Sequence, residues 1–170
     1  INILRQMGAK ISLTNEIEVG GEPVADIRVQ YAKLVGIEIP ESQVPLAIDE
    51  FPAIFIAAAR AQGETILTGA KELRVKESDR IQSMADGLNT LGIDAMATAD
   101  GIRIVGGEIG SGRVLSHHDH RIAMAFAIAG LRAQGEIIVE DCSNVATSFP
   151  DFIVCAASVG LVINTETVND

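Results

Sequence analysis

Apolar and polar residues recur along the chain with the periods of helices and strands. Three segments share one order: the last turn of an amphipathic helix, a glycine, and the start of a strand. They cover residues 4–11, 88–95 and 156–163, with Gly8, Gly92 and Gly160 after the helical turns. Glycine adopts the left-handed conformation that closes many helices, so each segment predicts a helix that ends at the glycine and a strand that follows.

Two further helices, at 52–62 and 121–134, are predicted to be apolar around most of their circumference. The sequence Arg-Ala-Gln-Gly-Glu occurs near the end of each one and leads into a strand, at 65–68 and 137–140. A helix without a polar face is typical of a buried position. We therefore expect these two helices in the interior of the domain.

The helices and strands repeat as a unit of roughly 70–80 residues: a buried helix, a strand, a loop, an amphipathic helix and a second strand. Two full copies occupy 49–115 and 116–170, after a partial first copy at 1–48. We therefore predict a single, partial α/β domain over 1–170, with pseudo-threefold symmetry, buried parallel helices and outer sheets. The first helical pattern begins at Ile1 without a capping residue, which indicates part of a longer protein.

The strongest concentration of charge lies at 71–80, where four cations accompany three acids. Ser78 is predicted to cap the amphipathic helix that follows, so Lys76, Glu77 and Arg80 lie at a helix N-terminus. Backbone N–H groups and the helix dipole favour anions there. The segment fits either a solvated first helical turn or a site for an anionic substrate, with a carboxylate able to move a proton.

Three other helix starts carry polar or charged residues. Asp49 and Asp119 precede the two apolar helices, Arg121 follows Asp119 closely, and Thr147 and Ser148 are expected to begin the last amphipathic helix. Equivalent helices of a pseudo-symmetric domain point the same way, so their N-termini are expected to meet and form an anion site. Helix capping alone would also explain the two aspartates, the threonine and the serine.

Bulk composition narrows the function classes. A net charge of −10 argues against nucleic acid and anionic membranes as partners, and no apolar run reaches membrane-spanning length. Cys142 and Cys155 have no metal-site spacing and are predicted to be reduced thiols in the core of a cytoplasmic protein. The histidine-rich segment 117–120 lacks further ligands at the spacings of known metal sites, so no metal is predicted.

Three motifs carry a resemblance to a known family. They are Leu-Arg-Val-Lys-Glu-Ser-Asp-Arg at 73–80, Asp-His-Arg-Ile-Ala-Met at 119–124 and Ala-Thr-Ser-Phe-Pro-Asp at 146–151. In this order they resemble the 5-enolpyruvylshikimate-3-phosphate (EPSP) synthase family, over nearly the whole chain. The resemblance implies two similar domains of the inside-out α/β barrel type, each with three units. This chain would be most of the C-terminal domain, and without the N-terminal domain it is expected to be inactive.

The resemblance also implies a reaction. Members of the family transfer the enolpyruvyl group of phosphoenolpyruvate to the 5-hydroxyl of shikimate 3-phosphate and release phosphate. The reaction belongs to the shikimate pathway of aromatic amino acid biosynthesis, needs no metal or organic cofactor, and is the target of glyphosate. Its chemistry requires a base, an acid and a cluster of cations.

Five residues take roles by the same resemblance. Asp49 matches the carboxylate that binds the shikimate hydroxyl and acts as base. Glu77 matches the carboxylate that exchanges a proton at C3 of phosphoenolpyruvate, and Lys76 matches the lysine near the 5-hydroxyl. Arg80 and Arg121 match the arginines that bind phosphoenolpyruvate.

Three positions complete the resemblance or depart from it. His120 matches a histidine close to the glutamate, which implies a supporting hydrogen bond. Thr147 is a candidate substrate-binding residue, but many members carry lysine there, so the third cation and the response to glyphosate stay open. Glu72 stands where some members have a phosphate-binding Asn, and that role is not transferred because a carboxylate repels phosphate. Two alternatives remain: enolpyruvyl transfer to a UDP-sugar, and a non-catalytic anion-binding module.

Overall fold

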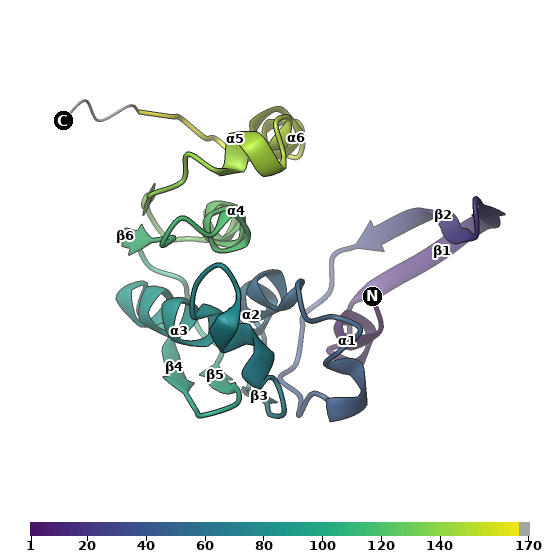
Figure 1. Cartoon of the computed structure of the whole chain (residues 1–170), viewed down its shortest axis with the longest axis horizontal. Helices are drawn as coiled ribbons and strands as arrows, with labels where there is room; N and C mark the ends of the chain where they lie inside the picture. Colours follow the sequence, from purple (N-terminus) through teal and green to yellow (C-terminus); the bar gives the residue numbers. More distant parts are fainter. Residues whose placement is uncertain (167–170) are drawn as a thin grey trace.

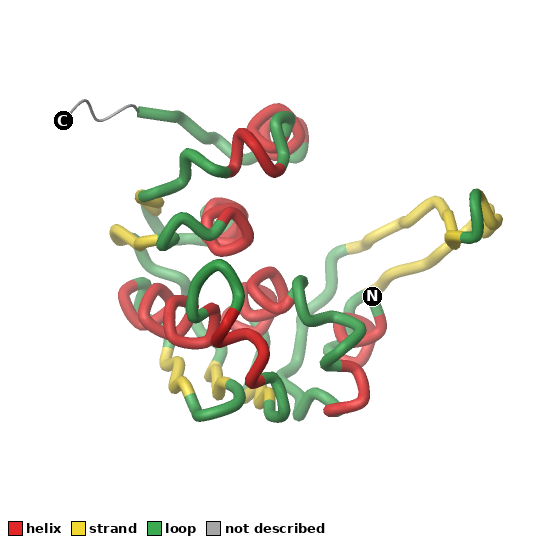
Figure 2. Tube along the Cα trace, in the orientation of Figure 1, coloured by secondary structure: helices red, strands yellow, loops and turns green. Residues whose placement is uncertain are grey.

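The computed structural model describes residues 1–166, and its most buried helices, α2, α3 and α4, lie inside the outer strands. Helices α2, α3 and α4 occupy the middle of the body, and strands β3, β4 and β5 run along one side (Figures 1 and 2). The expected α/β class is confirmed. In chain order the elements are α1 (Asn2–Gln6), β1 (Lys10–Val19), β2 (Glu22–Gln30), η1 (Glu41–Gln43), α2 (Phe51–Ala59), β3 (Glu64–Leu67), η2 (Lys71–Val75), α3 (Arg80–Thr90), β4 (Asp94–Ala97), β5 (Ile102–Val105), β6 (Gly112–Leu115), α4 (His120–Ala129), β7 (Ile137–Glu140), α5 (Val145–Ser148) and α6 (Phe152–Ser158).

The strands form three small sheets. The order β3-β5-β4 is antiparallel, β6 and β7 pair in parallel, and β1 and β2 form an antiparallel hairpin. In β5, Ile102 and Ile104 are buried while Arg103 and Val105 are partly exposed, as a sheet with one face on the core requires. The hairpin β1–β2, which the sequence patterns did not predict, extends away from the body (Figure 1).

The core is mostly aliphatic, with three buried phenylalanines, Phe51, Phe55 and Phe126, and it is centred on the helices. The side chains of Phe51, Ile54 and Phe55 on α2 are buried, as expected for a helix without a polar face. Helices α3 and α4 approach closely because α3 has no side chain at Gly87. A Cβ atom there would lie 2.3 Å from Cζ of Phe126 on α4. This contact sets how closely the two helices pack at this level of the core.

The predicted glycine helix ends are confirmed by backbone conformation. The φ angles of Gly8, Gly92 and Gly160 are +93°, +83° and +97°, in the region that glycine adopts without strain. Strands follow the first two glycines, as predicted. The strand predicted after Gly160 is wrong, since residues 161–166 are described and contain no regular element.

The two apolar helices are shorter than their patterns predicted. Helix α2 ends at Ala59 rather than 62, and α4 ends at Ala129 rather than 134. In both cases the backbone of the predicted last turn pairs elsewhere. The N–H of Gln62 donates to Leu34 O at 2.8 Å, and that of Gln134 donates to Ile109 O at 2.8 Å. These bonds tie each helix end to a neighbouring segment instead of extending the helix.

Two predicted caps are wrong. Asp79, rather than Ser78, caps α3, because its side chain accepts the N–H of Gln82 at 3.0 Å. Ser148 is the last residue of the short helix α5, and α6 begins after Asp151 without a side-chain cap bond. The predicted capping box at this point does not form.

The prediction of core thiols is also wrong. Cys142 and Cys155 are both free and both exposed. The first lies in the loop after β7 and the second lies on α6, outside the main core. Within residues 1–166, no helix is both long and apolar enough to span a membrane.

Candidate active site

The N-terminal ends of α2, α3 and α4 meet at one side of the domain, as the repeat predicted. Asp49 lies just before α2, Arg80 opens α3, and Asp119 and Arg121 lie at the start of α4. Direct contacts join all three ends: Arg80 binds Asp49 and Asp119, and Arg121 binds Asp49. The three helices therefore bring residues more than thirty positions apart into one polar cluster.

Arg80 is the centre of this cluster. Its side chain is only 1% exposed, and its guanidinium donates to three carboxylates. Nε lies 2.8 Å from Oδ2 of Asp119, Nη1 lies 3.0 Å from Oδ1 of Asp49, and Nη2 lies 2.7 Å from Oε2 of Glu77. Burial lowers the pKa of Arg80, but the three acids raise the pKa by more than burial lowers it. The guanidinium therefore stays charged.

Asp119 is fully buried and its carboxylate is saturated with donors. Besides Arg80, it accepts the hydroxyl of Ser78 at 3.1 Å and the backbone N–H of Arg121 at 3.0 Å. Burial alone would raise its pKa, but the hydrogen bonds and charge of Arg80 outweigh burial and hold the pKa below the ordinary 3.8. Asp119 is therefore a carboxylate that stays ionised inside the protein.

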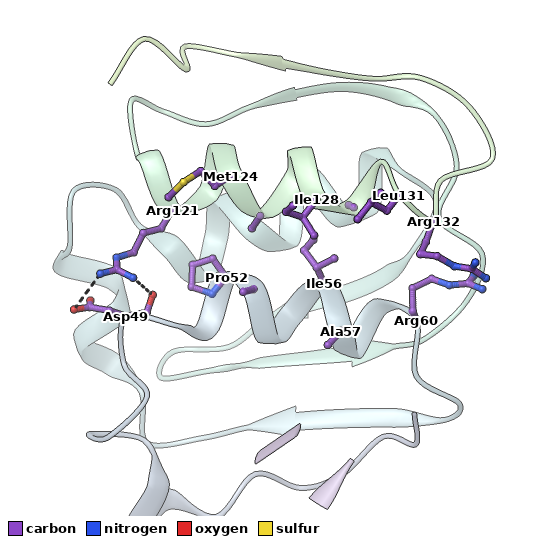
Figure 3. Close-up of a pocket in the computed structure, with 13 residues that line it drawn as sticks. Asp49, Pro52, Ile56, Ala57, Arg60, Arg121, Met124, Ile128, Leu131 and Arg132 are labelled. Carbon is purple, nitrogen blue, oxygen red and sulfur yellow. Dashed lines mark hydrogen bonds and ion pairs between the residues drawn. The ribbon is translucent and has the colours of Figure 1, made fainter. Parts of the chain in front are cut away.

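Lys76 and Arg121 approach Asp49 from two other directions. Nζ of Lys76 lies 3.5 Å from Oδ1 of Asp49 and 2.6 Å from Oε1 of Glu72. Nη1 of Arg121 donates to the Asp49 carbonyl at 3.0 Å, and its Nη2 lies 3.9 Å from Oδ2 (Figure 3). Desolvation is the largest single influence on Asp49 and raises its pKa, but the hydrogen bond from Arg80 and the charges of Arg121 and Lys76 together lower the pKa below its ordinary value.

The cluster neutralises its own cations. Lys76, Arg80 and Arg121 each contact at least one carboxylate, and Arg80 contacts three. An anionic ligand must therefore take the place of a carboxylate or use the free edge of a cation. Of the three cations, Arg121 is the best placed to bind such an anion. Its side chain is 35% exposed, and its contacts to carboxylate oxygens are 3.7 Å or longer.

Two predicted site residues are not joined to this cluster. Thr147 is exposed on α5, and within residues 1–166 its side chain makes no hydrogen bond to the cluster. His120 is half-buried at the start of α4, and the hydrogen bond to Glu77 that the resemblance implied does not form in the described part of the chain. Both assignments stay predictions.

A groove of about 390 Å³ runs between α2 and α4 and opens beside Asp49 and Arg121 (Figure 3). The groove is lined mostly by apolar side chains, including Pro52, Ile56 and Ile128. This lining offers few hydrogen-bond donors to a phosphate. A polar pocket of about 380 Å³ lies against the start of α3 and is lined by Glu77, Ser78, Asp79, Gln82, Ser83, Asp86 and His117. Among residues 1–166, no three His, Cys, Asp or Glu side chains are grouped as metal ligands would be.

The sequence patterns missed two participants. Glu72, which its sequence position marks only as a poor phosphate ligand, is the nearest acid to Lys76. Asp119, which the pattern predicts only as a helix cap, is also the buried partner of Arg80. Glu72 and Lys76 are four residues apart, a spacing at which opposite charges on a helical turn often pair, so the sequence could have suggested this contact. For the second pair, the expected meeting of the helix starts places Arg80 and Asp119 near each other, but it does not indicate that the two side chains pair.

The fold and sequence both match known proteins. NikO, an enolpyruvyl transferase from Streptomyces tendae, superposes with a TM-score of 0.65 at 19% identity, over 99% of this chain and 36% of NikO. EPSP synthase from Acinetobacter baumannii superposes with a TM-score of 0.95 at 55% identity, over 98% of this chain and 39% of that structure. The 3-phosphoshikimate 1-carboxyvinyltransferases of Nitrosococcus oceani and Methylococcus capsulatus are 66% and 65% identical over 163 residues.

The chain therefore has the α/β fold that EPSP synthase from Acinetobacter baumannii and NikO share. The family model of EPSP synthase (3-phosphoshikimate 1-carboxyvinyltransferase) matches residues 1–154. The chain belongs to this family, as the resemblance indicated. It covers 37% of the length of the two bacterial relatives, while they cover 96% of the chain.

Proposed function

We propose that the polypeptide containing this chain transfers the enolpyruvyl group of phosphoenolpyruvate to the 5-hydroxyl of shikimate 3-phosphate. The observation that supports this most strongly is the meeting of Asp49, Glu77, Lys76, Arg80 and Arg121 within one set of contacts. These residues supply a base, a proton carrier and cations, which are the groups that the reaction requires. Lys76, Glu77, Arg80 and Arg121 lie in the first two motifs of the family resemblance, and Asp49 precedes both.

Asp49 suits the role of base. It stays ionised because Arg80, Arg121 and Lys76 surround it, and its side chain is 42% exposed, so a hydroxyl can reach it. As the 5-oxygen of shikimate 3-phosphate adds to C2 of phosphoenolpyruvate, Asp49 accepts the hydroxyl proton. Arg121 and Lys76 bind the anionic groups of the substrates beside it.

Glu77 suits the role of proton carrier at C3. Its side chain is 51% exposed while one oxygen binds Arg80, so it faces both the cluster and the solvent. Glu77 gives a proton to C3 as the new bond forms at C2, and the tetrahedral intermediate carries a methyl group. It then takes a proton back from that methyl group as the C–O bond to phosphate breaks. The proton held by Asp49 leaves with the phosphate.

The remaining part of the polypeptide forms the other wall of the site in this proposal. The relatives are much longer than the chain, which covers 37% of their length. The cluster is open on one side, and its cations are already paired with acids. Binding of shikimate 3-phosphate is expected to depend on further contacts from that part, so the chain alone is expected to lack turnover.

Steady-state phosphate release tests this function. The full-length enzyme is expected to release phosphate only when both substrates are present, and the isolated chain is expected to release none. Turnover with UDP-N-acetylglucosamine instead of shikimate 3-phosphate would favour the alternative acceptor. Absence of turnover with either acceptor, together with NMR shifts at Arg121 on addition of phosphate, would favour an anion-binding module.

A further inference from the structure

We propose that Asp119 is a positioning residue that holds the side chain of Arg80 and the backbone of Arg121 in the geometry needed to bind phosphoenolpyruvate. The inference rests on the proposed function. It gives Asp119 a role beyond that of a helix cap, in which the residue acts through the two arginines that it binds. Its carboxylate is fully buried, and all its neighbours are groups of the protein.

The first step of the argument is the orientation of the guanidinium. Asp119 takes the edge of Arg80 formed by Nε and Nη2, at 2.8 Å from Oδ2 and 3.4 Å from Oδ1. A guanidinium is planar, so fixing one edge fixes the direction of the others. The remaining N–H groups point at Asp49 and Glu77, the proposed base and proton carrier.

The second step concerns Arg121. Oδ1 of Asp119 accepts the backbone N–H of Arg121 at 3.0 Å and so fixes the first turn of α4. From this turn the side chain of Arg121 reaches the backbone oxygen of Asp49 at 3.0 Å. The buried carboxylate of Asp119 thus orients two arginines that both bind Asp49. Ser78 donates the fourth hydrogen bond to the Asp119 carboxylate.

The third step separates positioning from capping. Asp79 and Asp119 each cap a helix through a backbone N–H at 3.0 Å, at the starts of α3 and α4. Asp79, however, pairs with Arg74 and makes no hydrogen bond to the cluster within residues 1–166. Asparagine is as good a cap as aspartate. Asp79→Asn and Asp119→Asn therefore preserve capping alike, but only the second removes a charge from Arg80.

The experiment compares these two variants in the full-length enzyme. Asp119→Asn is expected to lower kcat/KM for phosphoenolpyruvate by about 100-fold, the usual order of loss for a misplaced binding group. The KM for shikimate 3-phosphate should change much less, and Asp79→Asn should leave both constants within about twofold of the wild type. Equal kinetics in the two variants would overturn the positioning role.

Two further readouts remove ambiguity. If Asp119→Asn does not fold, Ser78→Ala removes one hydrogen bond to the same carboxylate without changing any charge, and it should raise the KM for phosphoenolpyruvate several-fold. Unchanged kinetics of Ser78→Ala would then overturn the inference. A wild-type enzyme without enolpyruvyl transfer would instead refute the proposed function, so the two failures are distinguishable.

Discussion

Replacement of Arg80 by methionine removes the cation at the centre of the cluster while keeping an unbranched side chain that still fills part of the space. Its contacts with Asp49 and Glu77 involve half-exposed carboxylates, so each contributes at most about 1 kcal/mol. The contact with Asp119 differs because that carboxylate is fully buried. Removing one partner of a buried ion pair costs about 3–5 kcal/mol, and this term decides the outcome. We therefore expect a loss of about 3–5 kcal/mol in unfolding free energy at pH 7.

The loss should depend on pH in a defined direction. In the wild type the folded pKa of Asp119 lies below 3.8, so its stabilising effect is complete above about pH 4 and fades as pH falls through the lowered pKa. In Arg80→Met, burial without a cation raises the pKa of Asp119 above its unfolded value. The variant then loses stability as pH rises through the unfolded pKa, so the difference from wild type should be smaller at pH 4 than at pH 7.

Urea unfolding of the full-length enzyme at pH 7 and pH 4 measures both effects. Arg103→Met is the matched control, because Arg103 also joins two acids, Glu64 and Asp94, but on the outer face of a sheet. It should change the midpoint little at either pH. An Arg80→Met variant that matches this control, or that loses the same stability at both pH values, would refute the buried-pair reasoning.

Two further substitutions test the site and the packing behind it. Arg121→Ala should lower kcat/KM for phosphoenolpyruvate about 10- to 100-fold through loss of charge-assisted hydrogen bonds. Arg132→Ala, at the far end of the same groove, should change it less than twofold (Figure 3), and equal effects would contradict the assignment. Gly87→Ala would place Cβ 2.3 Å from Phe126 and should cost about 1–2 kcal/mol by urea unfolding, after helix propensity offsets part of the strain. Gly107→Ala, with 3.5 Å of clearance, is its control, and equal stability of the two variants would disprove the clash.

The sequence patterns predicted where the helices begin and that their N-termini meet, because similar segments recur along the chain. Left-handed glycines after α1, α3 and α6 follow from local conformational preference, which acts within a few residues. The meeting of the N-termini of α2, α3 and α4 follows from the symmetry of the repeat. Asp49, Glu77 and Arg80 could therefore be placed near one another before any coordinates were known.

The errors share a physical cause in long-range contacts. Ser78 and Asp79 are comparable caps, and Ser78 is drawn away by a hydrogen bond to Asp119, 41 residues later. The burial of Arg80 depends on that same aspartate, and no local pattern reports it. Cys142 and Cys155 are small enough to suit a core, but their exposure depends on where α5 and α6 pack.

The most direct test of the account is deuterium exchange at C3 of phosphoenolpyruvate. The full-length enzyme is incubated with both substrates in D2O, and phosphoenolpyruvate is recovered and analysed. If Glu77 carries the C3 proton, reversal of the methyl intermediate introduces deuterium in the wild type. Glu77→Gln should then slow this exchange by roughly two to four orders of magnitude. Exchange at the wild-type rate in Glu77→Gln would contradict the central claim that this cluster performs enolpyruvyl transfer.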